Sequence, residues 1–133
     1  MTQLEHSELS RKIIGAAMEV LNALGPGQDE KVYERAVEIE LELRGSHVVR
    51  QRQYAVTYKG HPIGTFIPDM LIDDLVLVDP KVVTSFNENH IAQMLGYLAV
   101  SGLKLALLLN FKHARLEWKR VVASSKAMPQ ESP

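Results

Sequence analysis

Between residues 66 and 83 the chain places charged residues inside apolar, strand-like sequence, FIPDMLIDDLVLVDPKVV. The segment is typical of two short strands that fold back on each other. Asp69 interrupts the first apolar run, and Asp79 and Lys81 interrupt the second. Because side chains alternate between the two faces of a strand, Asp79 and Lys81 should share a face. Charges among Val, Leu and Ile are unfavourable unless they pair or hold a metal. The hairpin therefore predicts either an ion pair or a functional site.

The composition is that of one globular domain. The chain has 133 residues, of which 46% are hydrophobic and 23% charged, enough to bury a single core. It contains no cysteine, which excludes disulfides and thiolate zinc sites and fits a cytoplasmic protein. We see no secretory signal and no apolar run that could span a bilayer, so no membrane partner is expected. The net charge of -1 does not favour or exclude nucleic acid as a partner.

Hydrophobic periodicity predicts the order of the elements. Helices are expected at 7–24, at about 30–44 and at about 88–101. Strands are expected at 47–58, in the two halves of the hairpin, at 103–111 and at 116–122. The run at 103–111 should be a buried central strand, parallel to the second hairpin strand because a helix separates the two. We expect an α/β (α+β) domain over 1–122, a mixed sheet flanked by helices in the order ααβββαββ. Residues 123–133 should form a disordered tail.

The third predicted helix carries two distinct stripes. The first stripe is apolar and should pack on the sheet: Ile91, Leu95 and Leu98. The second stripe is polar and lies on another face: His90, Gln93 and Tyr97. Polar groups repeated at helical spacing beside a charged hairpin are candidates for the same site.

Two motifs resemble those of a known group of enzymes. Pro68-Asp69 followed by Asp79-x-Lys81 resembles the PD-(D/E)xK signature of metal-dependent nucleases. Gly27-x-x-Glu30-x-x-Tyr33 looks like the signature of the small bacterial GxxExxY family within that superfamily. The segments IIGAAMEVLNALGPG, VTYKG, HIAQMLGYL and LLLNF are also similar to that family, so the resemblance covers roughly residues 8–122. It implies the αβββαβ core of restriction-endonuclease-like folds.

The resemblance also implies a role for each matching position. Glu30, Asp69, Asp79 and the carbonyl of Pro80 would hold Mg²⁺ or Mn²⁺, which prefer hard oxygen donors. Lys81 would assist the attacking water or stabilise the charge that develops on the phosphate. The remaining implied site residues are Gln93 for catalysis, and Tyr33, His90 and Tyr97 for nucleic-acid binding. DNA is expected rather than RNA, with a homodimer as a further possibility. The helix dipole alone would also explain an acid at Glu30.

One position departs from the pattern of the relatives. They usually carry Glu-Leu-Lys where this chain has Asp79-Pro80-Lys81. Aspartate reaches less far than glutamate, and Pro80 removes an N–H from what should be an interior strand. A kink at Pro80 is therefore expected to weaken cleavage and to favour Mn²⁺, because Mg²⁺ demands near-ideal octahedral geometry.

Three functional interpretations remain open from the sequence. The first is a metal-dependent nuclease. The second is a nuclease fold that has lost efficient chemistry and binds nucleic acid or protein. The third is a structural protein whose charged cluster is an ion-pair network. Metal binding at Asp79 distinguishes the first interpretation from the other two.

Overall fold

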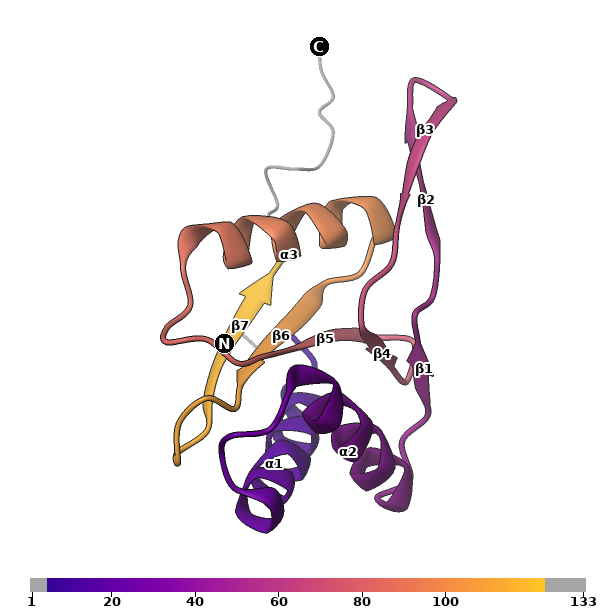
Figure 1. Cartoon of the computed structure of the whole chain (residues 1–133). Coiled ribbons are helices and arrows are strands. Elements are labelled where there is room, and N and C mark those ends of the chain that lie inside the picture. Colours follow the sequence, from indigo (N-terminus) through magenta and orange to yellow (C-terminus); the bar gives the residue numbers. More distant parts are fainter. Residues whose placement is uncertain (1–4, 124–133) are drawn as a thin grey trace, which may run out of the picture.

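The architecture is a mixed sheet with helices on both faces (Figure 1). It is seen in a computed structural model that describes residues 5–123, so the predicted tail lies outside the described residues apart from Ala123. Helices α1 (Ser7–Leu24) and α2 (Glu30–Leu43) pack on one face of the sheet. Helix α3 (Glu88–Ser101) packs on the other face. All three helices begin and end within a residue or so of the sequence prediction. No helix among residues 5–123 has the length and apolar character needed to cross a membrane.

The main sheet has the strand order β1-β4-β5-β6-β7. Its strands are β1 (Val48–Arg50), β4 (Met70–Ile72), β5 (Val76–Lys81), β6 (Leu105–Asn110) and β7 (Glu117–Val122). Strands β5 and β6 are parallel and the other neighbours are antiparallel. Every residue of β6 is buried, which confirms that this segment is a central strand parallel to the second strand of the hairpin.

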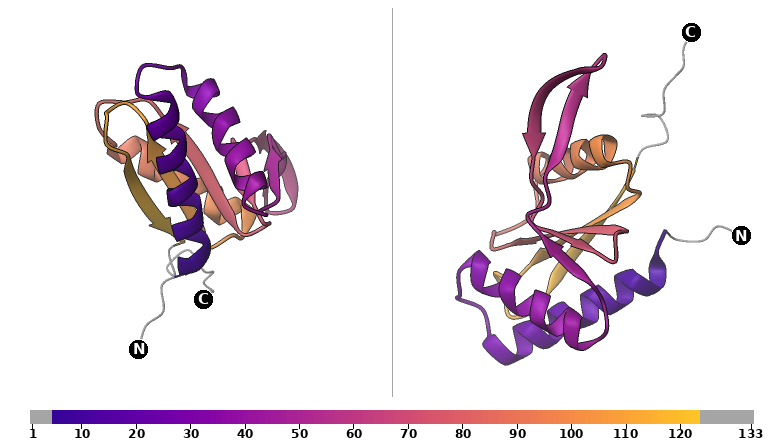
Figure 2. Two further views of the ribbon diagram at one scale, coloured as in Figure 1. Left: turned by 90° about the horizontal axis from the view of Figure 1, so that it is seen from below. Right: turned by 90° about the vertical axis from the view of Figure 1, so that its right-hand side faces the viewer.

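Strands β2 (Tyr54–Tyr58) and β3 (His61–Phe66) form a separate hairpin. The sequence predicted three strands before α3, and the structure has five, because two expected strands are each broken. The first breaks at Gln51, whose φ of 61° turns the chain out of the sheet. The second breaks at Pro68-Asp69, and the two breaks are adjacent: the Gln51 N–H donates to the Asp69 carbonyl at 3.2 Å. The hairpin therefore projects from the sheet beside α3 (Figure 2).

Alternate residues of the central strands face opposite helical layers. Val78 and Leu107 belong to the core beneath α1 and α2, whereas Leu77 and Leu108 belong to the core beneath α3. By this alternation Asp79 and Lys81, like Leu77, project towards α3. The α3 layer is therefore where a site at the end of β5 can be completed.

The apolar stripe of α3 differs from the prediction. Met94 and Leu98 are buried against the sheet, Ile91 is half-buried, and Leu95 is 38% exposed. The stripe follows the i, i+3, i+7 rows of the helix, which places Met94 and not Leu95 on the buried side. Met94 therefore takes the place of Leu95 in the stripe that packs on the sheet.

Candidate active site

Asp79 and Lys81 meet at the carboxyl end of β5. The Lys81 Nζ lies 3.4 Å from the Asp79 Oδ2, as expected for two residues on the same face of a strand. Asp79 is 8% exposed, so its carboxyl group is largely removed from water. Lys81 is the nearest cation and compensates part of that cost.

Asp69 completes an acidic pair with Asp79. The sequence suggested that Asp69 lies within a strand. In the structure it lies just before β4. The β4–β5 register ends at Met70 opposite Val78, and one further step would set Asp69 opposite Asp79. Burial, a hydrogen bond with Asp69 and the charge of Asp69 raise the pKa of Asp79 from 3.8 to about 7, while Lys81 lowers it. We call Asp69 and Asp79 the acid pair.

Pro80 lies where the ladder between β4 and β5 has already ended. The Phe111 N–H donates to the Lys81 carbonyl at 2.9 Å, so the backbone of Lys81 faces β6. Successive backbone groups of a strand point to opposite sides, so the carbonyl of Pro80 points to the β4 side, beyond its last paired residue. Strand β5 stays in register with β6 through Lys81. The expected kink is absent, and Pro80 costs no ladder hydrogen bond.

Replacement of Pro80 tests this interpretation. We expect Pro80→Leu to change the cleavage rate per folded molecule by less than about threefold, since no bond of the ladder is restored. The rate would be measured beside the unfolding midpoint in urea, so that a stability change is not read as a change in chemistry. A gain of tenfold or more in the rate would instead show that the proline impairs the site.

Tyr97 and Gln93 border the acid pair from α3. Burial and the charges of Asp79 and Asp69 raise the pKa of Tyr97, which places its hydroxyl near both acids. The Gln93 amide donates to that hydroxyl at 2.8 Å, although Gln93 itself is exposed at the rim. His90 is further along the helix and serves its N-terminus: the His90 Nδ1 accepts from the backbone N–H of Asn87.

Glu30 and Tyr33 lie apart from the acid pair. Glu30 is exposed at the start of α2, which packs on the opposite face of the sheet from Asp79. Between residues 5 and 123 there is no group of three or more acidic, histidine or cysteine side chains that could hold a metal. The sequence expectation of three converging carboxylates is therefore not met: this structure brings together two.

Tyr33 is a packing residue in this structure. It is completely buried and stacks on Phe111 with ring centroids 4.6 Å apart. Its hydroxyl donates to the Gly25 carbonyl at 2.6 Å and accepts from the Gln28 N–H at 3.1 Å. The ring thus fixes the loop between α1 and α2, and it is not placed to contact nucleic acid.

Removal of the Tyr33 hydroxyl should reduce stability. Tyr33→Phe keeps the ring and leaves the Gly25 carbonyl and the Gln28 N–H without this partner, so we expect a loss of ~1–2 kcal/mol in the free energy of unfolding. Urea unfolding followed by circular dichroism measures this loss. Tyr58→Phe, at an exposed tyrosine, is the matched control and should change stability by less than about 0.5 kcal/mol. Equal stability of the two variants would contradict the assigned role.

Two residues that support the site were not singled out by the sequence. Phe66 stacks on Tyr97 with ring centroids 4.4 Å apart and links the hairpin to α3. Asn110 is completely buried, and its amide bonds both the N–H and the carbonyl of Val83, at 3.1 and 2.8 Å. An asparagine that ends a fully apolar strand is a signal that could have drawn attention to it.

The family follows from a match over most of the chain. The family model of the PD-(D/E)XK nuclease superfamily matches residues 7–121. The chain belongs to the PD-(D/E)XK nuclease superfamily. This finding confirms the superfamily and the fold class, while membership of the GxxExxY family stays a prediction. Superfamily membership also fits the acid pair and Lys81 at the positions named by the motif.

Comparison with solved structures found distant likenesses. An alkaline exonuclease (LHK-Exo) from Laribacter hongkongensis is 13% identical with a TM-score of 0.48, over 88% of this chain and 84% of that one. A structure described as SSO0001 is 12% identical with a TM-score of 0.48, over 87% of this chain and 78% of that one. No curated protein matches the chain.

PD-(D/E)XK nucleases generally depend on a divalent metal, and the donors present here fit one. The available groups are the two carboxylates of the acid pair and the Pro80 carbonyl, all of them hard oxygen ligands. Two carboxylates carry like charges that repel each other in a largely buried site, and this repulsion favours a divalent cation between them. Mg²⁺ in particular is commonly held by one or two carboxylates together with water and substrate phosphate. A pair of acids is thus sufficient for a metal of this kind.

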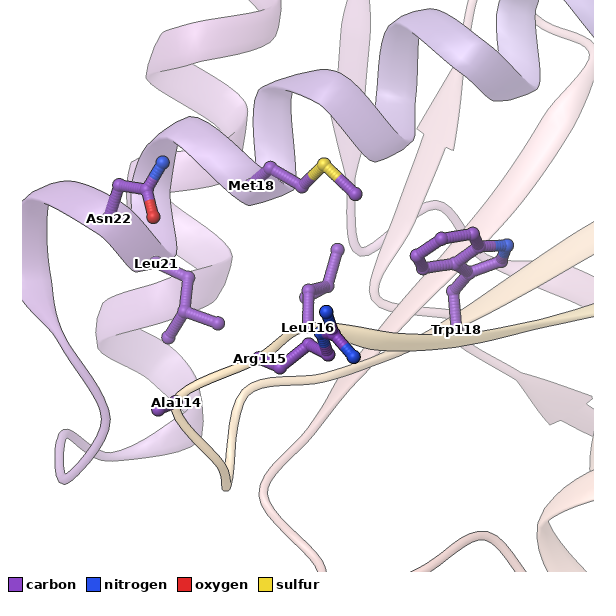
Figure 3. Close-up of a pocket in the computed structure, with 7 residues that line it drawn as sticks. All are labelled: Met18, Leu21, Asn22, Ala114, Arg115, Leu116 and Trp118. Carbon is purple, nitrogen blue, oxygen red and sulfur yellow. The ribbon is translucent and has the colours of Figure 1, made fainter.

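A cavity of about 650 Å³ lies elsewhere, between α1 and β7 (Figure 3). The residues that line it belong to α1 and to the end of the chain before and within β7: Met18, Leu21, Asn22, Ala114, Arg115, Leu116 and Trp118. None of them belongs to the acid pair or to the polar stripe of α3. This cavity is therefore separate from the candidate site.

Proposed function

We propose that this protein is a divalent-metal-dependent nuclease that hydrolyses phosphodiester bonds of DNA at the acid pair. The observation that carries the proposal is the meeting of Asp69, Asp79 and Lys81 at the end of β5. Two acids and a cation in a mostly apolar setting are unfavourable unless they pair or hold a metal. Their spacing in the sequence is that of the superfamily motif, which adds a chemical reason for their presence.

The acid pair would hold Mg²⁺ or Mn²⁺ together with the carbonyl of Pro80. Bound there, the metal would supply a water of lowered pKa and would neutralise charge on the attacked phosphate. Asp69 lies one step beyond the β4–β5 ladder, opposite Asp79, so each acid would supply one carboxylate to the metal. Burial and the neighbouring Asp69 carboxyl group raise the pKa of Asp79, and a bound cation would offset both effects by stabilising the charged form.

The other side chains would act on the substrate. The Lys81 ammonium, on the same face as Asp79, can orient the attacking water or stabilise negative charge that develops on the phosphate. The Tyr97 hydroxyl and the Gln93 amide, joined by a hydrogen bond, can position the phosphate from the α3 side. Lys81 is the group whose removal should affect chemistry without affecting the metal ligands.

Cleavage assays test the proposal. Supercoiled plasmid and an end-labelled single strand are incubated with the protein in Mg²⁺, Mn²⁺, Ca²⁺ or EDTA. Asp79→Asn, purified in parallel, is the control for a contaminating nuclease. Cleavage by the wild-type protein in Mg²⁺ or Mn²⁺ that the variant lacks would support the proposal. No cleavage with either metal, or equal cleavage by the variant, would contradict it.

A further inference from the structure

The projecting hairpin exposes apolar and aromatic side chains that the fold does not bury. We define the arm as strands β2 and β3 with Arg52 at its base; it extends past α3 (Figures 1 and 2). Tyr58 is 61% exposed and Ile63 is 64% exposed. Exposed apolar and aromatic side chains on a projection of this kind make it a candidate contact surface.

The charge of the arm is of one sign. Residues 48–68 contain no aspartate or glutamate, although the protein has 16 acidic residues. The basic residues of this segment include Arg50, which is paired with Glu34 at 3.0 Å and with Glu38 at 3.4 Å. Arg52 and Lys59 remain as charges on the arm itself. An acid-free, cationic projection is complementary to a polyanion.

A column of stacked groups connects the arm to the acid pair. Tyr97 stacks on Phe66 at 4.4 Å, Phe66 stacks on Tyr54 at 4.9 Å, and the Arg52 guanidinium lies 5.1 Å from the Tyr54 ring. The first ring of the column is the tyrosine that borders the acid pair. The base of the arm is therefore held beside the acid pair, and the surface of the arm is continuous with the site.

The arm also offers open space on its aromatic face. Tyr54, Val56 and Tyr58 alternate onto one face of β2, and Gly64 of β3 lies opposite Val56 on that face. Gly64 has no positive φ, and nothing lies within 4 Å of where its Cβ would be. The hairpin register shifts beside this position, between Val56 and Thr57. A glycine in a strand marks such a bulge or a place where a ligand approaches closely, and the open space at Gly64 allows that approach.

We propose that the arm binds an unpaired nucleic-acid strand and leads it to the acid pair. The proposal rests on the nuclease function and names its substrate as single-stranded. Bases would stack on Tyr58 and occupy the space over Gly64, while phosphates would contact Arg52 and Lys59, whose Nζ lies 5.4 Å from the Tyr58 ring. Aromatic rings and basic groups that alternate along a surface suit a strand whose bases are exposed. In a duplex those base faces are already stacked on each other, so the rings would gain nothing.

Fluorescence anisotropy with the full chain tests the arm separately from cleavage. The probes are a labelled 20-nucleotide DNA strand and the same sequence as a blunt duplex, both in EDTA. We expect Tyr58→Ala to weaken single-strand binding about fivefold or more, which corresponds to the loss of one base stack. Gly64→Leu should weaken it similarly by filling the open space. Ala55→Leu places the same leucine side chain on the opposite face of β2 and should leave the affinity unchanged.

Lys59 can be tested independently through the salt dependence of DNA binding. Lys59→Gln should lower the slope of log K against log salt concentration by about 0.7, the value for one phosphate contact on a single strand. Lys31→Gln, at an exposed lysine on α2, should leave the slope unchanged.

Three results would overturn the assignment of the arm. These are duplex binding at least as tight as single-strand binding, equal effects of Gly64→Leu and Ala55→Leu, or arm variants that dissociate a dimer in light scattering without a change in DNA affinity. Failure of the nuclease proposal is a different result, in which the wild-type protein binds the strand through the arm but does not cut it with any metal.

Discussion

Asp79→Asn should abolish cleavage and also stabilise the metal-free protein at pH 8. Loss of the carboxylate proposed to bind the metal is expected to reduce the cleavage rate by at least about a hundredfold. The gain in stability follows from the burial of Asp79 and its contact with Asp69, which raise its pKa to about 7 in the folded protein from 3.8. We expect the variant to gain ~1–3 kcal/mol at pH 8, because it no longer carries a charge that folding disfavours.

The stability difference between Asp79→Asn and wild type should depend on pH. Between about pH 4 and pH 7 the folded protein binds more protons at Asp79 than the unfolded chain does. The stability of the wild-type protein should therefore fall as pH rises through this window, and the penalty is complete above it. The difference between Asp79→Asn and wild type should be near zero at pH 4 and largest at pH 8. Urea unfolding in EDTA at both values measures the difference.

A matched acid provides the control for that experiment. Asp74 is exposed in the turn between β4 and β5, and Asp74→Asn should give the same stability as wild type at both pH values. Addition of Mn²⁺ should stabilise the wild-type protein and Asp74→Asn but not Asp79→Asn, since a ligand that binds only the folded state raises its stability. A loss of stability in Asp79→Asn at pH 8 would favour an ion pair with Lys81 as the purpose of the acid.

Lys81→Ala should separate chemistry from metal binding. We expect a loss of at least about a hundredfold in the cleavage rate, as for other groups that stabilise charge in a transition state. Calorimetric titration should show Mn²⁺ binding that is unchanged or tighter, because the Lys81 ammonium, 3.4 Å from the Asp79 Oδ2, would repel a cation bound by that carboxylate. The unfolding midpoint should shift by an amount equivalent to about 1 kcal/mol or less, as expected for a partly exposed ion pair.

Lys112→Ala, at an exposed lysine after β6, controls for the loss of a positive charge and should retain cleavage. If Lys81→Ala unfolds the domain, the lysine is structural and the ion-pair interpretation gains support. If wild type and Lys81→Ala both bind Mn²⁺ and neither cuts, the fold serves as a binding module.

The sequence predicted best those features that are set by local patterns. Helix boundaries follow from caps and periodicity: Gly25 ends α1 and Asn87 caps α3. The meeting of Asp79 with Lys81 follows from the period of a strand. The central position of β6 follows from its continuous apolar run. Each of these depends on a few neighbouring residues, so tertiary contacts had little opportunity to override it.

The parts that the sequence missed depend on contacts between distant segments. Glu30 is kept away from the acid pair because α2 packs on the other face of the sheet. The positive φ of Gln51, which directs the arm out of the sheet, is uncommon for a residue other than glycine and has no composition signal. The sequence therefore predicted one strand over 47–58, and the break at Gln51 was missed.

The end of the β4–β5 ladder has a consequence for the backbone inside the domain. A strand whose neighbour stops early leaves backbone groups without a ladder partner, and an unpaired N–H is costly when it is buried. Pro80 lies at this point in β5, Pro68 lies at the matching position before β4, and both residues are buried. Neither has an N–H that would need a partner. The proline that departs from the expected Glu-Leu-Lys motif therefore lets the ladder end inside the domain without a buried, unpaired N–H.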